Sequence, residues 1–391
     1  MAVIPITYNL RSLMVRRTTS LLTALGVALV VMIVVILLSF VGGLRSSLEL
    51  AGEAGNWIVL GRGTRSESES YIPREEFYVL RDRPEIATSA SGAALISPEV
   101  VLPFNAAVKR PASQYRPAYL RGVTPIAYQV HRGLRLIKGR WPSPGREEMV
   151  IGLKQAARFP ELGVGSTFKY GRRHWTIVGI FADRGSVLES EFWADLDVLQ
   201  QDARFENGFS SFHLVLKPAI AMEDSFRHAL TNDARLTVDA TSERQFYADQ
   251  AKVADQLRTL VLIVAIIVGT GAAFGGMNTM YASVAHRTRE VGVLRSLGFG
   301  RGAVLGSFLI ESVILGAAGG AMGDILAMLL SAATGLDHHL MSVGALVFSS
   351  AFTFSALAGG ILTALLIGIV GGLLPALRAA RLQLIESLHE A

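Results

Sequence analysis

The chain has 391 residues, of which 51% are hydrophobic and 18% charged, and its mean hydropathy is +0.41. This composition excludes a disordered chain, and the 39 glycines without a collagen period exclude a fibrous one. The absence of cysteine excludes disulfides, thiolate metal sites and cysteine nucleophiles. The net charge of +5 is small, so we expect no nucleic-acid partner, and the position of the basic residues is more informative than their sum.

Four apolar runs predict four membrane-spanning helices. The first run carries no charged residue and, at 1.5 Å per residue, is about 31 Å long, one hydrocarbon thickness. It is preceded by 20 residues and is longer than the apolar part of a signal peptide, so we interpret it as an uncleaved anchor. The runs are Leu21–Val41, Leu260–Ala285, Ala303–Thr334 and Gly344–Leu377.

The basic residues that flank these runs predict the orientation. They lie before the first run, between the second and third, and after the fourth, whereas the loop Gly335–Val343 has none. Cytoplasmic segments are enriched in Lys and Arg, so both termini are expected in the cytoplasm and the long segment between the first two helices outside it. The residues are Arg11, Arg16, Arg17, Arg287, Arg289, Arg295, Arg301, Arg378 and Arg381.

The predicted fold is an α-helical membrane protein with four transmembrane helices and a large mixed α/β periplasmic domain inserted between helices 1 and 2. The order is a cytoplasmic amino-terminal segment (1–20), helix 1 (21–44), the α/β domain (45–256), helix 2 (257–285), a cytoplasmic helix (286–302), helix 3 (303–334), a short outer loop (335–344), helix 4 (345–377) and a cytoplasmic tail (378–391).

The α/β domain is predicted from short β-like runs separated by Gly and Pro. Its composition is compatible with a subdomain inserted at about 91–204, and Ser66–Ser70 is a polar loop with no assigned role. Ser242–Arg258 is a polar helix that enters the second apolar run without a breaker; it is either a stalk that transmits motion or a plain linker. Strands are expected at Trp57–Leu60, Ala118–Gly122, Met149–Gly152, Trp175–Phe181 and Phe212–Leu216, and helices at Arg74–Asp82, Asp195–Arg204 and Ala221–Thr231.

No motif for enzyme chemistry is present. The sequence has no G-x-x-x-x-G-K-[ST], G-x-G-x-x-G, H-E-x-x-H or G-x-S-x-G. His338–His339, near Asp337, lacks further ligands at metal-site spacing. We therefore predict a non-enzymatic chain with no catalytic residue, metal site or bound cofactor. The isolated histidines are interpreted as surface or core residues: His131, His174, His213 and His228.

Two acids lie in the third apolar run, Glu311 and Asp324. Intramembrane acids are functional candidates by default. However, this run is longer than one bilayer, so we favour the interpretation that Glu311 reaches one interface and Asp324 the other. Proton transport would require acids facing each other, and the other runs offer no partner.

The segment between the second and third runs is a short helix that carries basic and apolar residues at helical spacing, followed by Gly298 and Gly300, which end it as C-cap glycines do. Such a helix either lies on anionic lipid or docks in a groove on a partner. Glu290 favours the partner, because a carboxylate gains nothing from anionic lipid.

Three stretches resemble the FtsX/MacB-type (type VII, mechanotransmission) permeases of ABC transporters. They are Leu10–Val31, Asn278–Gly323 (with SVAHRTREVGVLRSLG as the family-like signature) and Gly371–Leu388. The chain lacks the fused ATPase of MacB, and Arg381 is followed by Leu382, Gln383 and Leu384 where the family often has Arg-x-Asp-Pro. The size of the predicted outer domain is similar to the MacB or lipoprotein-releasing type.

The resemblance implies a bacterial inner-membrane complex. Two permease chains, identical or paralogous, would pair in lipid and each recruit a cytosolic ATPase that binds ATP and Mg²⁺. ATPase motion would reach the periplasm through a coupling helix at about 284–298, to drive export of a lipoprotein, lipid or amphiphile, with a periplasmic adaptor and outer-membrane protein as further partners. The alternative is an FtsX-like signalling scaffold that activates a periplasmic cell-wall hydrolase without transport. The residues expected to contact the ATPase are Arg287, Glu290, Val291, Leu294 and Arg295, and those expected in helix packing are Gly319, Gly320 and Gly323.

Overall fold

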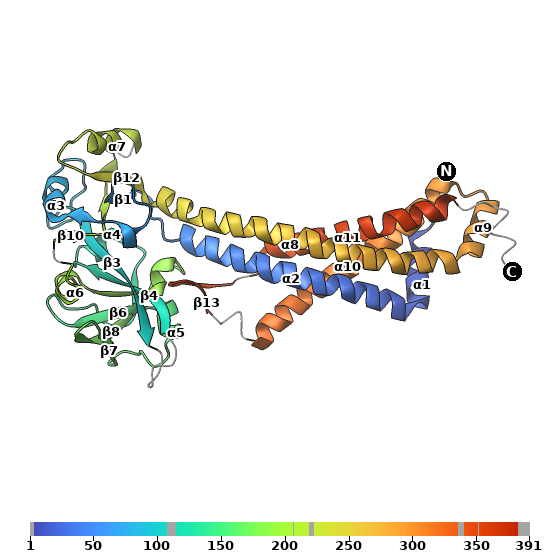
Figure 1. The fold of residues 1–391 in the computed structure, drawn as a ribbon, viewed down its shortest axis with the longest axis horizontal. Helices are drawn as coiled ribbons and strands as arrows, with labels where there is room; N and C mark the ends of the chain where they lie inside the picture. Colours follow the sequence, from blue (N-terminus) through green and yellow to red (C-terminus); the bar gives the residue numbers. More distant parts are fainter. Residues whose placement is uncertain are drawn as a thin grey trace. The chain divides into compact units, whose positions relative to one another are not determined.

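The computed structural model describes residues 4–107, 115–205, 207–218, 223–334, 340–350 and 352–381 (Figure 1). The chain forms two compact units. The helical unit comprises residues within 1–42, 255–337 and 350–391, and the α/β unit comprises residues within 43–254 and 338–349. The histidine pair 338–339, Asp337 and the tail from 382 onward lie outside the described residues.

Four long helices supply the apolar segments: α2 (Arg17–Glu49), α8 (Glu243–His286), α10 (Arg301–Thr334) and α11 (Phe354–Arg381). Each is long and apolar enough to cross a membrane, yet no more than 39% of any of their apolar windows is buried. Large apolar side chains such as Leu22, Ile266 and Leu329 are exposed instead. Apolar surface on this scale requires lipid around it, so the chain is a multi-pass membrane protein.

Small residues let the helices of this unit approach closely. A Cβ atom added to Gly319 would lie 2.8 Å from the carbonyl oxygen of Ala24, and one added to Gly323 would lie 2.7 Å from that of Ala28, both in α2. Gly320 faces α11 in the same way, since its Cβ would meet that of Ala364 at 2.7 Å. The three glycines expected in helix packing thus lie at close helix contacts, Gly319 and Gly323 against the backbone of α2 and Gly320 against side chains of α11.

The fourth helix begins later than the predicted 345. Residues of this region form a hairpin of β13 (Leu340–Val343) and β14 (Leu346–Ser349), and α11 begins only at Phe354. The hairpin belongs to the α/β unit, where Ser190 Oγ donates to the carbonyl of Val347 (2.7 Å) and accepts from its N–H (2.9 Å). The apolar side chains here serve protein packing, which hydropathy alone does not distinguish from membrane burial.

The α/β unit contains a ten-stranded sheet of order β12-β1-β11-β3-β4-β9-β6-β8-β5, with β7 paired to β8. All five predicted strands are present, as β1, β4, β6, β8 and β11, and β11 ends at Val215, one residue before the predicted Leu216. The bounds are β1 (Asn56–Gly61), β3 (Ile96–Ala107), β4 (Tyr115–Val123), β5 (Arg135–Gly139), β6 (Glu148–Gly152), β7 (Thr167–Tyr170), β8 (Arg173–Ala182), β9 (Glu191–Asp195), β11 (Ser211–Val215) and β12 (Val238–Ser242).

Shorter elements flank this sheet. The three predicted helices correspond to α3, α6 and α7, while the remaining pieces were not predicted. They are η1 (Glu67–Glu69), β2 (Ile72–Pro73), α3 (Arg74–Arg81), α4 (Ala127–Val130), α5 (Leu153–Arg158), η2 (Val187–Ser190), α6 (Leu196–Ala203), β10 (Gly208–Phe209) and α7 (Glu223–Thr231).

Two hydrophobic cores fill this unit. One includes Trp57, Phe212 and Phe226, from the ends of the segment, and the other includes Trp175 and Phe192, from its middle. Strand β3 joins them, because its first part pairs with β11 and its second part with β4. The middle segment therefore has its own core but shares one sheet with the rest.

Candidate functional site

The segment between α8 and α10 forms helix α9 (Thr288–Ser296), separated from α8 by the single residue Arg287. After α9 the N–H of Gly298 binds the carbonyl of Arg295 and the N–H of Phe299 binds that of Leu294, each at 3.2 Å. Gly298 has a φ of +95°, so this is a Schellman motif that ends the helix. The glycine stop is confirmed at Gly298, and Gly300 lies beyond the motif.

Arg287 is the centre of the site. Its side chain is buried, with the guanidinium 5.2 Å from the ring of Tyr8 in α1 (Ile6–Val15) and 5.0 Å from that of Phe308 in α10. Nη1 lies 2.9 Å from Glu311 Oε2, and Nε lies 2.9 Å from Glu290 Oε2. Burial alone would lower the pKa of Arg287, but the opposing effect of its contacts with Glu290, Tyr8 and Glu311 is larger, so the pKa is raised above its usual value. A permanent cation thus joins α1, α9 and α10.

Both acids of the third apolar run are buried among the helices, and their depth in a membrane stays a prediction. The side chain of Glu311 is 4% exposed and pairs with Arg287, and Ser12 Oγ also donates to it at 3.4 Å. Asp324 is buried beside Gly360 of α11, and its Oδ1 has no hydrogen-bond partner among the described residues. The partner of Glu311 was missed because it lies outside the apolar runs.

The five residues expected to contact an ATPase divide by exposure. Glu290 is exposed, Leu294 and Arg295 are half-buried, and Arg287 and Val291 are buried. Val291 packs in a core with Met280, Val284, Val304, Phe308, Ala376 and Ala379. Arg287 and Val291 therefore support the exposed face of α9 from behind, while the face itself also presents Arg289, Val293 and Leu297.

Replacing Arg287 with Met is expected to lower the free energy of unfolding of the purified full chain by about 1–3 kcal/mol. The thioether keeps apolar volume but leaves Glu311 without its cation, and the cost is limited because that carboxyl can take up a proton. The measurement is the shift in thermal unfolding in detergent, with the exposed Arg289→Met as control. Equal stability of both variants would show that the buried ion pair contributes nothing.

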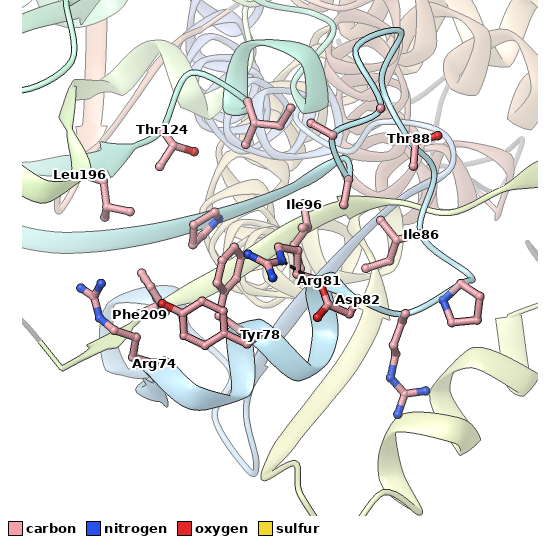
Figure 2. A pocket seen from close by; sticks show the side chains of 18 of the residues that line it. Arg74, Tyr78, Arg81, Asp82, Ile86, Thr88, Ile96, Thr124, Leu196 and Phe209 are labelled. Atoms are coloured by element: carbon pink, nitrogen blue, oxygen red, sulfur yellow. Dashed lines mark hydrogen bonds and ion pairs between the residues drawn. The ribbon is translucent and has the colours of Figure 1, made fainter.

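The α/β unit contains a cavity of about 710 Å³ (Figure 2). Ile86, Ile96 and Leu196 form part of its apolar wall. Arg74 lies over the ring of Phe209 at 5.4 Å, and Thr124 Oγ1, also in the lining, is buried without a partner among the described residues. The volume is in the range of small-molecule sites, and the lining combines apolar and charged side chains.

A cluster of buried charges lies elsewhere in the α/β unit. Arg121 in β4 is 1% exposed and binds three carboxylates: Glu67 (Nη1–Oε1, 2.8 Å), Glu99 (Nη1–Oε2, 2.6 Å) and Glu191 (Nε–Oε2, 2.6 Å). Burial would raise the pKa of Glu67, but Arg121 and then His213 hold it well below its usual value.

Sequence reasoning missed this cluster. Glu67 lies in the Ser66–Ser70 segment, to which it assigned no role, and His131 and His213, expected to be isolated, are both buried here. His174 and His228 are exposed. The members come from η1, from the strands β3, β4, β9 and β11, and from the loop after α4, so no local spacing signals them.

The family follows from comparison with known proteins. Residues 20–233, more than half of the chain, match the MacB-like periplasmic core domain. Residues 262–384 match the FtsX-like permease C-terminal domain. The chain belongs to the MacB/FtsX family of ABC transporter permeases. The resemblance of the three membrane stretches to this family is confirmed.

This MacB/FtsX permease spans less than half the length of the curated relatives YknZ and MacB. The uncharacterized ABC transporter permease YknZ of Bacillus subtilis is 34% identical over 190 residues, 46% of this chain and 45% of YknZ. The macrolide export ATP-binding/permease protein MacB of Nitrobacter winogradskyi is 36% identical over 150 residues, 38% of this chain and 22% of that protein. The solved periplasmic region of MacB from Actinobacillus actinomycetemcomitans aligns with 50% of this chain and 92% of that structure, at 12% identity and a TM-score of 0.39.

Proposed function

We propose that this MacB/FtsX permease is the transmembrane subunit of an ABC transporter in a bacterial inner membrane. A separate cytosolic ATPase binds α9. ATP-driven motion of α9 then drives export or extraction of a lipoprotein, lipid or amphiphile at the periplasmic side. The chain itself is non-catalytic in this proposal, with ATP and Mg²⁺ on the ATPase, and a second permease chain completes the complex. An adaptor and an outer-membrane protein are further partners.

The observation that carries this proposal is the position of Arg287. This residue is the N-cap of α9, follows directly on α8, and forms a buried ion pair with α10. A displacement of α9 must therefore move the ends of both helices or break that ion pair. Helix α8 continues without interruption from His286 to Glu243, so a displacement of α9 acts on the end of a 44-residue helix.

The exposed side of α9 supports a protein partner. Val293 and Leu297 are 46% and 71% exposed and lie beside the charged Arg289 and Glu290. An amphipathic face of this kind fits a groove on another protein, with apolar anchors in the centre and charges that fix orientation. The cavity of the α/β unit supports an amphiphilic cargo by its size and mixed lining.

The first experiment is purification of the native complex in mild detergent and identification of its chains by mass spectrometry. An ABC ATPase with an adaptor or a lipoprotein supports the proposed exporter. An ATPase with a cell-wall hydrolase and no cargo would instead support the signalling scaffold. A stable complex without any ATPase would contradict both.

Charge reversal of Glu290 tests the coupling contact. We expect Glu290→Lys to lower stimulation of the co-purified ATPase about tenfold, the loss typical of an interfacial charge pair, while the chain stays folded. Glu290 also accepts internal hydrogen bonds from Tyr8 Oη (3.0 Å) and from Arg287 Nε (2.9 Å). Thermal unfolding of Glu290→Lys in detergent therefore shows whether their loss disturbs the fold, and Tyr8→Phe is the control that removes the Tyr8 bond alone. Normal ATPase stimulation and normal export in Glu290→Lys would rule out this contact.

A further inference from the structure

Two buried histidines and a carboxylate converge within the charge cluster of the α/β unit. His131 Nε2 lies 2.8 Å from Glu99 Oε1, and His213 Nε2 lies 3.8 Å from Glu99 Oε2. The two imidazole rings are 4.7 Å apart. One ligand atom from each of the three residues lies within 4.8 Å of the others, and all three residues are buried. The proposed transport function uses none of them.

These separations suit a tetrahedral metal ion. With Zn–N and Zn–O bonds of about 2.0–2.1 Å, neighbouring ligand atoms of a tetrahedral site lie about 3.3 Å apart. His131 Nε2 lies 2.8 Å from Oε1 of Glu99 and His213 Nε2 lies 3.8 Å from Oε2 of the same carboxylate, so the two imidazoles approach it at distances on either side of this value. Glu67 can complete the set, since its Oε1 lies 3.0 Å from His213 Nε2. Two imidazoles and two carboxylates are typical ligands of zinc and other divalent transition metals.

The outer partner of His213 also fits such a site. Glu243, the first residue of α8, places Oε1 2.7 Å from His213 Nδ1. A carboxylate that accepts the Nδ1 proton fixes the tautomer in which Nε2 is the free ligand atom, the arrangement found around metal-bound histidines. The hydrogen bond therefore points the coordinating nitrogen toward Glu99 and Glu67.

The charge of the cluster calls for a further cation. Glu67, Glu99, Glu191 and Glu243 are at most 10% exposed, and Arg121 is the guanidinium in contact with three of them. Four buried carboxylates against one guanidinium leave an excess of negative charge, which is costly to bury without further positive charge. A divalent ion between Glu99 and the two imidazole rings would supply that charge at one point.

Arg121 shares one of the proposed ligand atoms. It holds Glu99 by Oε2 at 2.6 Å, so Oε1, the oxygen nearest His131, is left for an ion. Its Nη1 also lies 2.8 Å from Glu67 Oε1, so an ion bound there would share that oxygen with the guanidinium. The remaining contacts of Arg121 are with both oxygens of Glu191 and with Glu67 Oε2.

We propose that Glu99, His131 and His213, with Glu67 as fourth ligand, bind one divalent transition-metal ion, for which Zn²⁺ is the best match. Because Glu99 lies in β3 and His213 in β11, while His131 follows α4, the ion would fasten the strand that joins the two cores. Its role is structural, and it is independent of ATPase coupling.

The test uses the purified full chain in detergent, stripped with EDTA and titrated with Co²⁺. We expect one equivalent to give the visible d–d absorption of tetrahedral cobalt, and Zn²⁺ to abolish it by displacement. His131→Ala and Glu99→Gln should each weaken Co²⁺ binding at least about tenfold. His174→Ala, which removes an exposed histidine, is the matched control and should bind as the wild type does.

Two results would overturn the proposal: no cobalt absorption in stripped, folded wild-type protein, or an absorption that persists unchanged in folded His131→Ala. Circular dichroism establishes folding in each case. If a variant fails to fold, X-ray absorption of Zn²⁺-loaded wild-type protein decides without it: two imidazole ligands support the site, and fewer contradict it. ATPase stimulation is not a readout, so failure here leaves the proposed coupling function unaffected.

Discussion

Replacing Arg121 with Met is expected to lower the free energy of unfolding of the α/β unit by about 3–5 kcal/mol, the cost of removing one partner from a buried ion pair. The guanidinium is 1% exposed and binds Glu67, Glu99 and Glu191 at 2.6–2.8 Å. Without it these carboxylates are buried and face one another with less compensating charge. The loss approaches the whole stability of an ordinary domain.

The measurement is denaturant or thermal unfolding of the purified full chain, followed by tryptophan fluorescence, since Trp193 lies beside this cluster. The matched control is Arg140→Met, which also removes a guanidinium from a carboxylate, Glu148, at 2.6 Å, but whose side chain is 53% exposed. We expect the control to lose no more than about 1 kcal/mol. Similar losses in the two variants would show that burial does not strengthen the Arg121 interactions.

Replacing Gly323 with Leu is expected to separate α2 from α10, so that most molecules of the variant do not fold correctly. The added Cβ alone would lie 2.7 Å from the carbonyl oxygen of Ala28 and 2.7 Å from Val31 Cβ. A backbone carbonyl cannot rotate away, so the helices must move apart. We expect a cost at or above about 3 kcal/mol, the upper end of the range for overpacked cores.

Fluorescence-detected gel filtration of the tagged full chain tests this. Gly323→Leu should lose the monodisperse peak, whereas Gly275→Leu should keep it, because Gly275 is exposed on α8 and nothing lies within 4 Å of its added Cβ. A monodisperse Gly323→Leu protein of wild-type stability would mean that α2 and α10 do not pack through this glycine.

The helices and the fold class were predictable because they depend on local, periodic signals. Apolar runs gave four spans, and Gly298 gave the end of α9, since a positive φ is a local requirement. The hairpin at Leu340–Ser349 was not predictable. Its apolar residues Val347 and Phe348 are buried in the protein, but hydropathy alone cannot distinguish such residues from those that face lipid.

The site was predictable only in part, because tertiary contacts decide it. Spacing placed Arg287 on a short basic helix, but its burial depends on Tyr8 and Phe308, which are distant in sequence. In the same way Glu67, His131 and His213 meet only after the sheet has assembled. Nothing in their neighbouring residues indicates this.

The single-residue connection between α8 and α9 has a consequence for efficiency. A joint of one residue can turn only about its own φ and ψ, here −112° and 12°. The side chain of the same residue is clamped between two rings and paired with Glu311. Such a connection is rigid, so a displacement of α9 would not be absorbed by rearrangement of a flexible loop. Even a small displacement of α9 would therefore move the end of α8 by a similar amount.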